Sequence, residues 1–144
     1  MPELPEVETS RRGIEPHIRK MRITKVTIRK RKLRWPISYV IDQNLPGQKV
    51  LSVTRRAKYL LINFKAGSIM LHLGMTGSVS IVENSTPAGI HDHVDIDFDS
   101  GKTLRFRDPR RFGSLHWSKK PMQHKLLKSL GPEPLSDHFD ANYL

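Results

Sequence analysis

Apolar residues recur at helical spacing near the start of the chain, at Leu4, Val7, Ile14 and Ile18. Charged residues fall largely on the opposite side, as in a helix that packs one face on a core. This pattern predicts a helix from about Pro5 to Glu15. Pro5 suits the first helical position, whereas Gly13 and Pro16 weaken the end of the helix.

Alternating apolar and polar residues follow, with many β-branched and aromatic side chains, a pattern typical of strands. The predicted strands are Ile23 to Ile28, Val50 to Val53, Tyr59 to Phe64, Ile69 to Leu73 and Val79 to Val82. Short strands at regular spacing, separated by Gly, Pro and Asn, favour a sandwich over a βαβ sheet. The predicted fold is therefore mainly β with flanking helices: a two-sheet antiparallel β-sandwich or flattened barrel preceded by an N-terminal helix.

Two further segments, Val94 to Phe98 and Thr103 to Arg107, predict a hairpin in some detail. Their apolar residues share one face only if the connecting loop holds an odd number of residues. A three-residue loop at 99–101 satisfies this, with Gly101 in the left-handed conformation that glycine tolerates. The expected pairs are Asp95 opposite Arg105 and Ile96 opposite Leu104.

After Trp117 the helical spacing returns, at Met122, Leu126, Leu127 and Leu130, until Gly131 and Pro132 stop it. The stretch from Pro134 to Leu144 is polar and has little to bury. We therefore expect one domain over residues 1–131, with residues 132–144 as the start of a linker.

Composition narrows the class of partner. A chain of 144 residues suits one domain with a proper core. Its formal net charge of +11 indicates an acidic partner, for which nucleic acid is the usual candidate. No long apolar run or amphipathic basic helix offers a membrane anchor, and Glu3, Glu6 and Glu8 interrupt any signal core. We expect a cytoplasmic protein that does not bind membranes.

Metal and cofactor sites receive little support. The sequence has no cysteine, which excludes disulfides and thiolate zinc sites. His91 and His93 lie one residue apart, with no other clustered ligand, so we expect no metal and no cofactor in this chain. The run from Arg29 to Arg34, ending at Trp35, resembles a nucleic-acid patch, although a basic hairpin loop explains it equally well.

The N-terminus is the most reactive feature of the sequence. Removal of Met1 leaves Pro2 with a secondary amine, which can attack an aldehyde carbon and form an iminium ion. An N-terminal amine titrates near neutrality, at about 8 in reference peptides, and Glu3 is close enough to exchange a proton. If Met1 stays attached, Pro2 is an amide and cannot react in this way. An ordinary helix start with acidic residues explains the same sequence without chemistry.

Several motifs together resemble one known family. Residues 1–18, MPELPEVETSRRGIEPHI, closely resemble the start of formamidopyrimidine-DNA glycosylase, a bacterial enzyme that excises oxidised purines. The same family is resembled, in the same order, by RRAKYLL at 55–61, HLGMTGS at 72–78, DPRRFG at 108–113 and GPEPLS at 131–136. The related endonuclease VIII branch shares the Met-Pro-Glu start, but Leu4 and the PEVET continuation resemble the formamidopyrimidine branch.

The resemblance implies a glycosylase and β,δ-lyase with catalytic residues Pro2, Glu3 and Lys58. Pro2 is then the nucleophile at C1′ of the damaged nucleoside, and Glu3 protonates the sugar or shuttles protons. Glu6 lies in the active-site region, although a helix-start role suits it as well. Lys58 holds a DNA phosphate near the lesion. Strand alternation puts it on one face with Arg56, where a solvated strand edge is the plainer interpretation.

The resemblance also implies a set of DNA-binding residues. Met75, in a glycine-flanked turn, fills the void that a flipped base leaves. Arg110 faces the unpaired partner base, and Phe112 inserts between neighbouring base pairs. Arg111 lies between these two residues in the same loop, and His91 contacts a phosphate. Pro109 and Gly113 bracket that loop and favour exposure, although without the family Phe112 would more often belong to a core.

The full-length family carries a C-terminal half with a helix-two-turn-helix and a four-cysteine finger that binds one structural zinc. This chain contains neither, so we expect an N-terminal half that acts as a monomer. Its expected partner is double-stranded DNA with an oxidised purine or an abasic site, which the fragment alone binds weakly and turns over poorly. Two rivals stay open: a basic β-domain that binds nucleic acid without catalysis, and a tautomerase with an N-terminal proline, although tautomerase chains are smaller and less basic.

Overall fold

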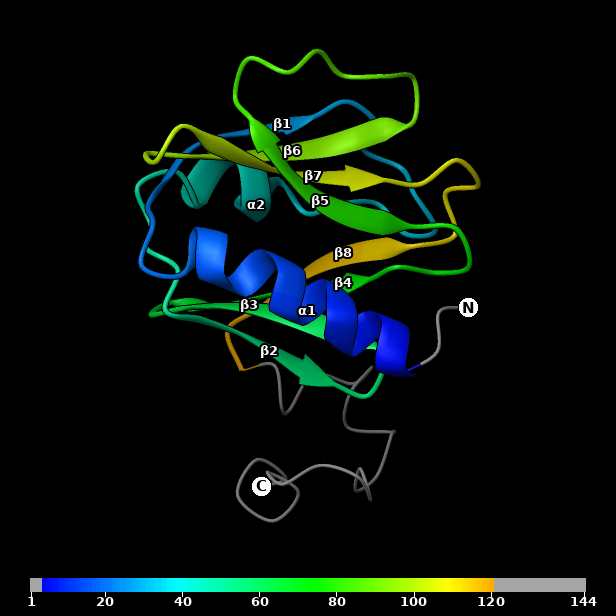
Figure 1. The fold of residues 1–144 in the computed structure, drawn as a ribbon, viewed down its shortest axis with the longest axis horizontal. Helices are drawn as coiled ribbons and strands as arrows, with labels where there is room; N and C mark the ends of the chain where they lie inside the picture. The colour runs from blue at the N-terminus through cyan, green and yellow to red at the C-terminus, as the bar shows by residue number, and fades with distance from the viewer. Residues whose placement is uncertain (1–3, 121–144) are drawn as a thin grey trace.

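The computed structural model describes residues 4–120, which form a two-layer β-sandwich (Figure 1). One sheet has the order β1-β6-β7-β5, formed by Ile23–Ile28, Asp92–Phe98, Lys102–Arg107 and Ser78–Glu83. The other has the order β2-β3-β4-β8, formed by Ser52–Arg56, Tyr59–Phe64, Gly67–His72 and Ser114–Ser118. All neighbouring strands are antiparallel. The predicted fold class is thus confirmed.

Two helices pack against the edges of the sandwich. α1, Leu4–Ile18, contacts β2 and β5, which are edge strands of the two different sheets, and it lies across the opening between them (Figure 1). α2, Tyr39–Asn44, contacts the edge strand β1. No helix within residues 4–120 has the length and apolarity needed to cross a bilayer.

The end of α1 differs from the prediction. The helix runs through Pro16 to Ile18 instead of ending near Glu15. Ile14 and Ile18 are both buried in the core, at 2% and 0% exposure. Burial of two isoleucine side chains outweighs the backbone hydrogen bond that a proline in the last turn removes.

The core lies between the two sheets. Its largest fully buried side chains include Phe98 of β6 and, from the facing sheet, Leu60, Ile62, Ile69 and Leu71. Val7 of α1 and Ile41 of α2 belong to the same cluster. The helices therefore cover the core at the edges of the sandwich.

The β6–β7 hairpin has the predicted register. Asp95 is opposite Arg105 and Ile96 is opposite Leu104, across a loop of residues 99–101 in which Gly101 has φ +87°. The register shifts between Asp92 and Val94, so His93 occupies a bulge. The hairpin prediction is confirmed, and the bulge is a feature that alternation did not reveal.

Two elements were missed and one was displaced. Trp117 belongs to β8, a short strand that pairs with β4 and that no sequence pattern predicted. The helix predicted after it lies outside the described residues. α2 has only six residues, too few for a periodic signal. Ser38 caps its N-terminus, and the Ser38 Oγ accepts a hydrogen bond from the Val40 N–H (3.2 Å). β2 spans Ser52–Arg56 instead of Val50 to Val53.

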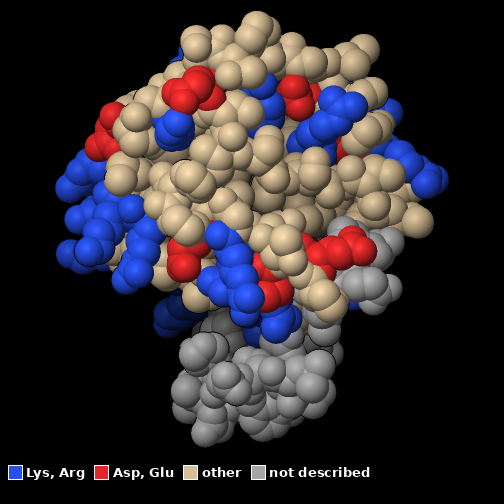
Figure 2. All heavy atoms as spheres, in the orientation of Figure 1, with Lys and Arg blue, Asp and Glu red and all other residues tan. Residues whose placement is uncertain are grey.

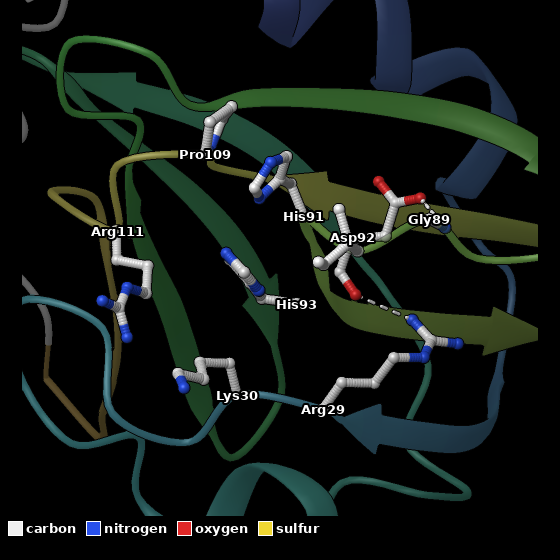
Figure 3. Close-up of a pocket in the computed structure, with 9 residues that line it drawn as sticks. Arg29, Lys30, Gly89, His91, Asp92, His93, Pro109 and Arg111 are labelled. Carbon is white, nitrogen blue, oxygen red and sulfur yellow. Dashed lines mark hydrogen bonds between the residues drawn. The ribbon is translucent and has the colours of Figure 1, made fainter.

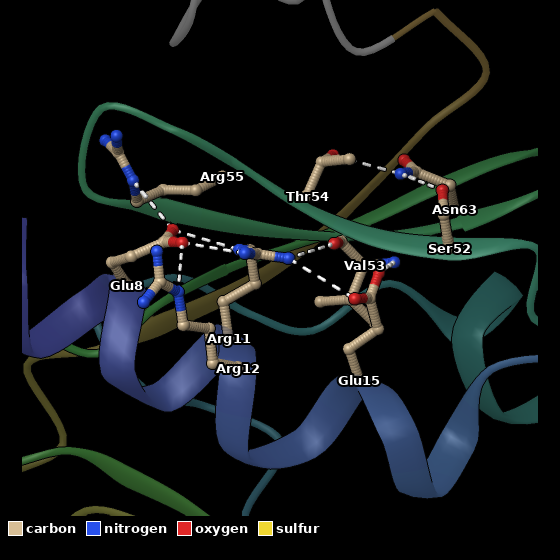
Figure 4. Close-up of polar contacts among 9 residues, drawn as sticks. All are labelled: Glu8, Arg11, Arg12, Glu15, Ser52, Val53, Thr54, Arg55 and Asn63. Atoms are coloured by element: carbon tan, nitrogen blue, oxygen red, sulfur yellow. Dashed lines mark hydrogen bonds and ion pairs between the residues drawn. The ribbon is translucent and has the colours of Figure 1, made fainter. Parts of the chain in front are cut away.

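Side chains of α1 take the place of a further strand along the edge of β2 (Figure 4). Arg11 Nη1 donates to the carbonyl oxygen of Val53 (3.3 Å), and the Val53 N–H donates to Glu15 Oε2 (3.3 Å). Glu8 accepts from Arg11 (2.7 Å) and Arg12 (3.0 Å), and it also pairs with Arg55 of β2 (3.3 Å). The helix therefore satisfies the polar edge of the sheet that it covers.

This network changes the acidity of Glu8. The hydrogen bond from Arg11 lowers the pKa of its carboxyl group from 4.5 to about 2, together with the bond from Arg12 and the charges of both arginines, against the opposing effect of burial. Glu8 and Glu15 thus have a structural role, because their carboxylates bind groups of β2. This role distinguishes them from the residues at the start of the chain that are predicted to react.

Candidate functional site

One end of the sandwich gathers the turns that carry the predicted site residues. These are the β2–β3 turn, the β4–β5 turn, the loop from β7 to β8, the residues just before β6 and the segment that follows β1. In Figure 1 this end lies at the right, where α1 also begins. The fold therefore brings together segments that are up to about eighty residues apart in sequence, because antiparallel strands return each connection to the same end.

Pro2 and Glu3, the predicted nucleophile and its acid, lie outside the described residues. Glu6 is exposed in the first turn of α1, and its carbonyl oxygen accepts a hydrogen bond from Ser10 Oγ (3.1 Å). The roles of Pro2, Glu3 and Glu6 therefore stay predictions.

Lys58 lies in a two-residue turn, which corrects its predicted place in a strand. Arg56 pairs directly with Tyr59, so Ala57 and Lys58 form the tip of the β2–β3 hairpin. Ala57 has φ +52°, a left-handed conformation that a sequence without glycine or asparagine did not indicate. Lys58 therefore does not share a strand face with Arg56, which is buried. It lies at the tip of the hairpin and is partly exposed.

His72 was missed by the sequence analysis and lies next to Lys58. Its ring is half-buried, with its centroid 5.1 Å from that of the Tyr59 ring, and its Nδ1 accepts a hydrogen bond from the Gly74 N–H (3.2 Å). Burial lowers the pKa of His72, and the positive charges of Lys58 and Arg34 lower it further. At neutral pH the ring is therefore uncharged with its proton on Nε2. Its place at the start of the HLGMTGS motif was the available signal.

The turn that follows β4 exposes Met75. This side chain is 56% exposed at the tip of residues 73–77, and the Gly77 N–H closes the turn by donating to the Leu73 carbonyl oxygen (2.9 Å). Gly74 has φ +69°, and a Cβ there would lie 2.8 Å from the backbone nitrogen of Gly113 and the carbonyl carbon of Phe112. The Met75 turn thus packs directly against the loop that carries Phe112.

The 108–113 loop carries Arg110 and Phe112, two of the side chains that the resemblance assigns to DNA. Phe112 is 43% exposed, and the guanidinium carbon of Arg110 lies 4.8 Å from the centre of its ring. Arg111 has φ +58°, which turns the backbone sharply between them. Phe112 is thus a surface side chain supported by a cation–π contact, and the alternative that it belongs to the core is wrong.

His91 lines an open pocket of about 480 Å³ beside this loop (Figure 3). Lys30 and Arg111 reach the same pocket, and so does Arg29, whose guanidinium is held by Asp95 Oδ2 (2.7 Å). Three basic side chains around a concave surface suit an anionic group such as a phosphate. Arg29 and Lys30 come from the basic run of residues 29–34, which is an irregular segment between β1 and α2.

His93, also in this pocket, has a structural role. Its Nε2 lies 2.7 Å from the carbonyl oxygen of Asp108, so this nitrogen carries the proton and donates. The centres of the His91 and His93 rings are 6.4 Å apart. Within residues 4–120 no group of three or more His, Asp or Glu side chains is placed to hold a metal ion.

Basic side chains alone do not locate the site. On the face drawn in Figure 2, Lys and Arg side chains lie over both ends of the molecule. At the end described above, two exposed apolar side chains, Met75 and Phe112, stand among the cations. This combination, more than net charge, is what a surface that both neutralises phosphates and contacts bases requires.

Comparisons with known proteins agree with this arrangement. A family model described as the formamidopyrimidine-DNA glycosylase N-terminal domain matches residues 1–115. Formamidopyrimidine-DNA glycosylases of Pseudomonas paraeruginosa and Stutzerimonas stutzeri are 56% and 55% identical over all 144 residues. These matches cover 100% of this chain and 53% of each relative, so the chain spans about half the length of the curated relatives it matches.

Solved structures show the same fold. The glycosylase of Lactococcus lactis, non-covalently bound to DNA containing an AP site, has a TM-score of 0.84 at 27% identity, over 96% of this chain and 54% of that one. The same protein in complex with DNA containing FAPY-dG has a TM-score of 0.81 at 29% identity, over 92% of this chain and 51% of that one.

The family match covers the turns that carry the predicted site residues. The family model runs from the N-terminal residues through the Lys58 and Met75 turns and the 108–113 loop into β8, and the relatives extend well past it. On sequence and fold together, the chain belongs to the formamidopyrimidine-DNA glycosylase family, as its N-terminal domain.

Proposed function

We propose that this chain is the catalytic half of a DNA glycosylase and β,δ-lyase that removes oxidised purines, such as formamidopyrimidines and 8-oxoguanine, from double-stranded DNA. The observation that carries the proposal is the arrangement at one end of the sandwich. Met75 and Phe112 stand exposed on adjoining turns, with Lys58 beside one turn and the His91 pocket beside the other. Exposed apolar side chains among cations suit a protein that unstacks bases while it holds phosphates.

Base flipping assigns a role to each of these side chains. A nucleophile cannot reach C1′ while the nucleoside is stacked, so the damaged base must leave the duplex first. Met75 then fills the vacated space, Phe112 inserts between the neighbouring base pairs, and Arg110 faces the unpaired partner base. Lys58 and His91 contact phosphates, which hold the distorted backbone in place.

The proposed chemistry begins at Pro2 and rests on the sequence resemblance. The free amine attacks C1′, the bond from C1′ to the base breaks, and the base leaves with its bonding electrons and takes up the proton that the amine nitrogen loses. Glu3 protonates the ring oxygen as the sugar opens, and the nitrogen lone pair then forms the iminium. The iminium acidifies the C2′ hydrogen. Loss of that proton expels the 3′ phosphate, and a second elimination expels the 5′ phosphate.

Borohydride trapping tests the proposal. The chain, with removal of Met1 verified by mass spectrometry, is incubated with a duplex containing an abasic site and reduced. We expect a covalent adduct that peptide mapping places on Pro2 and that is lost in Pro2→Gly and in a sample that retains Met1, because the first lacks the secondary amine of proline and the second holds it as an amide. A duplex containing 8-oxoguanine tests the glycosylase step in the same way.

The outcomes separate the proposal from a binding module. Absence of an adduct with the abasic duplex, in a sample that binds this DNA tightly, would indicate a non-catalytic domain. Since the relatives are about twice as long, we expect the 144-residue chain to bind a tetrahydrofuran-site duplex more weakly than a full-length relative. Equal affinities in a gel shift would contradict that part of the proposal.

A further inference from the structure

Asp108 is an acidic residue at the start of the DPRRFG motif, directly after β7, and it is fully buried at 0% exposure. Neither the sequence patterns nor the proposed chemistry gives it a role. A buried carboxyl group is retained only where its oxygens are satisfied by hydrogen bonds. Its partners therefore indicate what it holds together.

The two carboxyl oxygens of Asp108 join two different turns. Oδ1 accepts a hydrogen bond from Thr76 Oγ1 (2.8 Å), in the turn that exposes Met75. Oδ2 accepts one from the Gly113 N–H (2.7 Å), directly after Phe112. One planar group thus bonds to the neighbours in sequence of both exposed apolar side chains.

The backbone of Asp108 makes similar connections. Its N–H donates to the carbonyl oxygen of His91 (3.0 Å), and its carbonyl oxygen accepts from His93 Nε2 (2.7 Å) and from the Arg111 N–H (3.2 Å). Asp108 is therefore hydrogen-bonded to the Met75 turn, to the rest of the 108–113 loop and to residues of the His91 pocket.

Close packing leaves little freedom around these bonds. A Cβ at Gly113 would lie 2.6 Å from the His72 carbonyl oxygen and 3.0 Å from Asp108 Oδ2. The Gly74 position is equally tight against Gly113. The two turns therefore meet backbone to backbone, with the Asp108 carboxyl group as the polar connection between them.

We propose that Asp108 is a positioning residue that fixes Met75 and Phe112 relative to each other. This inference rests on the proposed function, in which both side chains enter the same opened base stack. If the two turns moved independently, binding would have to fix the relative position of Met75 and Phe112. The entropic cost of that ordering would lower the affinity for DNA. The bond to Thr76 sets this separation before DNA arrives.

The test uses Thr76→Val, which removes the hydroxyl bond and preserves the shape of the side chain. We expect it to weaken binding to a tetrahydrofuran-site duplex by about fivefold, the worth of one typical hydrogen bond. Thr54→Val is the matched control. Its Oγ1 accepts a side-chain hydrogen bond from Asn63 Nδ2 (3.0 Å), but Thr54 lies on β2 away from these turns, so this variant is expected to bind the duplex as the wild type does.

A double-mutant cycle distinguishes positioning from general loosening. In a Met75→Ala background the wedge is gone, so Thr76→Val is expected to cost nothing further. Asp108→Asn is expected to restore most of the affinity that Asp108→Ala loses. Its amide can accept from Gly113 and donate to the Thr76 hydroxyl. Additive effects of Thr76→Val and Met75→Ala would overturn the inference.

Amide hydrogen exchange tests the same inference without DNA. Thr76→Val is expected to speed exchange of the Gly113 and Gly77 N–H groups, and Thr54→Val to leave both unchanged. Unchanged exchange in Thr76→Val would overturn the positioning role even if the protein binds damaged DNA as proposed. A wild-type chain that does not prefer the tetrahydrofuran-site duplex over an undamaged one, with normal coupling in the exchange experiment, would overturn the proposed function and leave the structural coupling established.

Discussion

At the scale of single residues, Gly74 connects the Met75 turn to the 108–113 loop. It combines a left-handed backbone, φ +69°, with direct contact to the backbone of the 108–113 loop. His72, the residue two positions earlier, uses the Gly74 N–H as a hydrogen-bond donor. Small changes at these positions therefore affect both the exposed methionine and the histidine beside Lys58.

Gly74→Ala is predicted to destabilise the domain by about 2 kcal/mol or more, because it adds backbone strain to a steric clash. Urea unfolding measures the loss. Gly101→Ala, at φ +87° with open space around it, isolates the strain and is expected to cost about 1 kcal/mol. Gly13→Ala, in α1 with no neighbour within 4 Å, is expected to stabilise by about 0.5–1 kcal/mol. Equal losses at positions 74 and 101 would contradict the proposed clash.

The pKa of His72 provides a second prediction at this scale. NMR titration is expected to give a midpoint below 6.5, because burial and nearby cations disfavour the charged ring. Lys58→Met removes one of these charges and is expected to raise the midpoint. Lys65→Met, in the β3–β4 turn at the opposite end, serves as the control and is expected to have no effect. An unchanged midpoint in Lys58→Met would show that Lys58 does not lie beside His72.

At the scale of elements, α1 is attached to β2 through charged side chains as well as through Val7, Ile14 and Ile18. The exposed side of the helix is thus partly a polar interface with the edge of a sheet. This attachment also fixes the direction of the helix, whose first turn lies at the end of the sandwich that carries the site (Figure 1).

Glu8→Gln is predicted to destabilise the domain by about 1 kcal/mol at pH 7. The pKa of Glu8 is lowered in the folded state to about 2, so its contribution is complete above the unfolded value near 4.5 and disappears as pH falls toward 2. Urea unfolding between pH 2 and 7 measures this. The free energy of unfolding is expected to fall less steeply with decreasing pH in the variant than in the wild type. Glu83→Gln, in an exposed pair with Lys102, is the control at pH 7 and is expected to change stability little.

The limits of the sequence patterns are clearest at this scale. β1, β3 and the 99–101 loop followed from alternation and turn chemistry, because each is a regular local feature. β8 and α2 are short, and pairing with β4 or packing on β1 defines them more than their own periodicity does. Lys58 was placed in a strand because nothing in Ala57-Lys58 resembles a turn. The role of Asp108 depends on contacts across 32 residues, which no local pattern contains.

At the scale of the whole molecule, the net charge of +11 supplies attraction to DNA in general. Basic side chains lie over both ends of the face drawn in Figure 2. Affinity therefore comes from many cations, whereas the choice of a damaged site depends on the turns at one end. These two contributions respond differently to salt.

Binding of the chain to duplex DNA is predicted to weaken steeply with salt, since each phosphate contact releases counterions. Lys30→Gln, in the pocket beside His91, is expected to reduce the slope of log K against log salt by about 1. Lys65→Gln, at the opposite end, is expected to change the slope less. Equal changes for both variants would indicate binding to the basic surface without a defined site.

The most direct test of the account is an NMR titration of the 144-residue chain with a tetrahydrofuran-site duplex. We expect the amide shifts to concentrate in the 57–58, 73–77 and 108–113 turns and around His91. We expect little change in the 65–66 turn or the 99–101 loop at the other end. Shifts centred on those two connections, or spread evenly over the surface, would contradict the assignment of the site to this end of the sandwich.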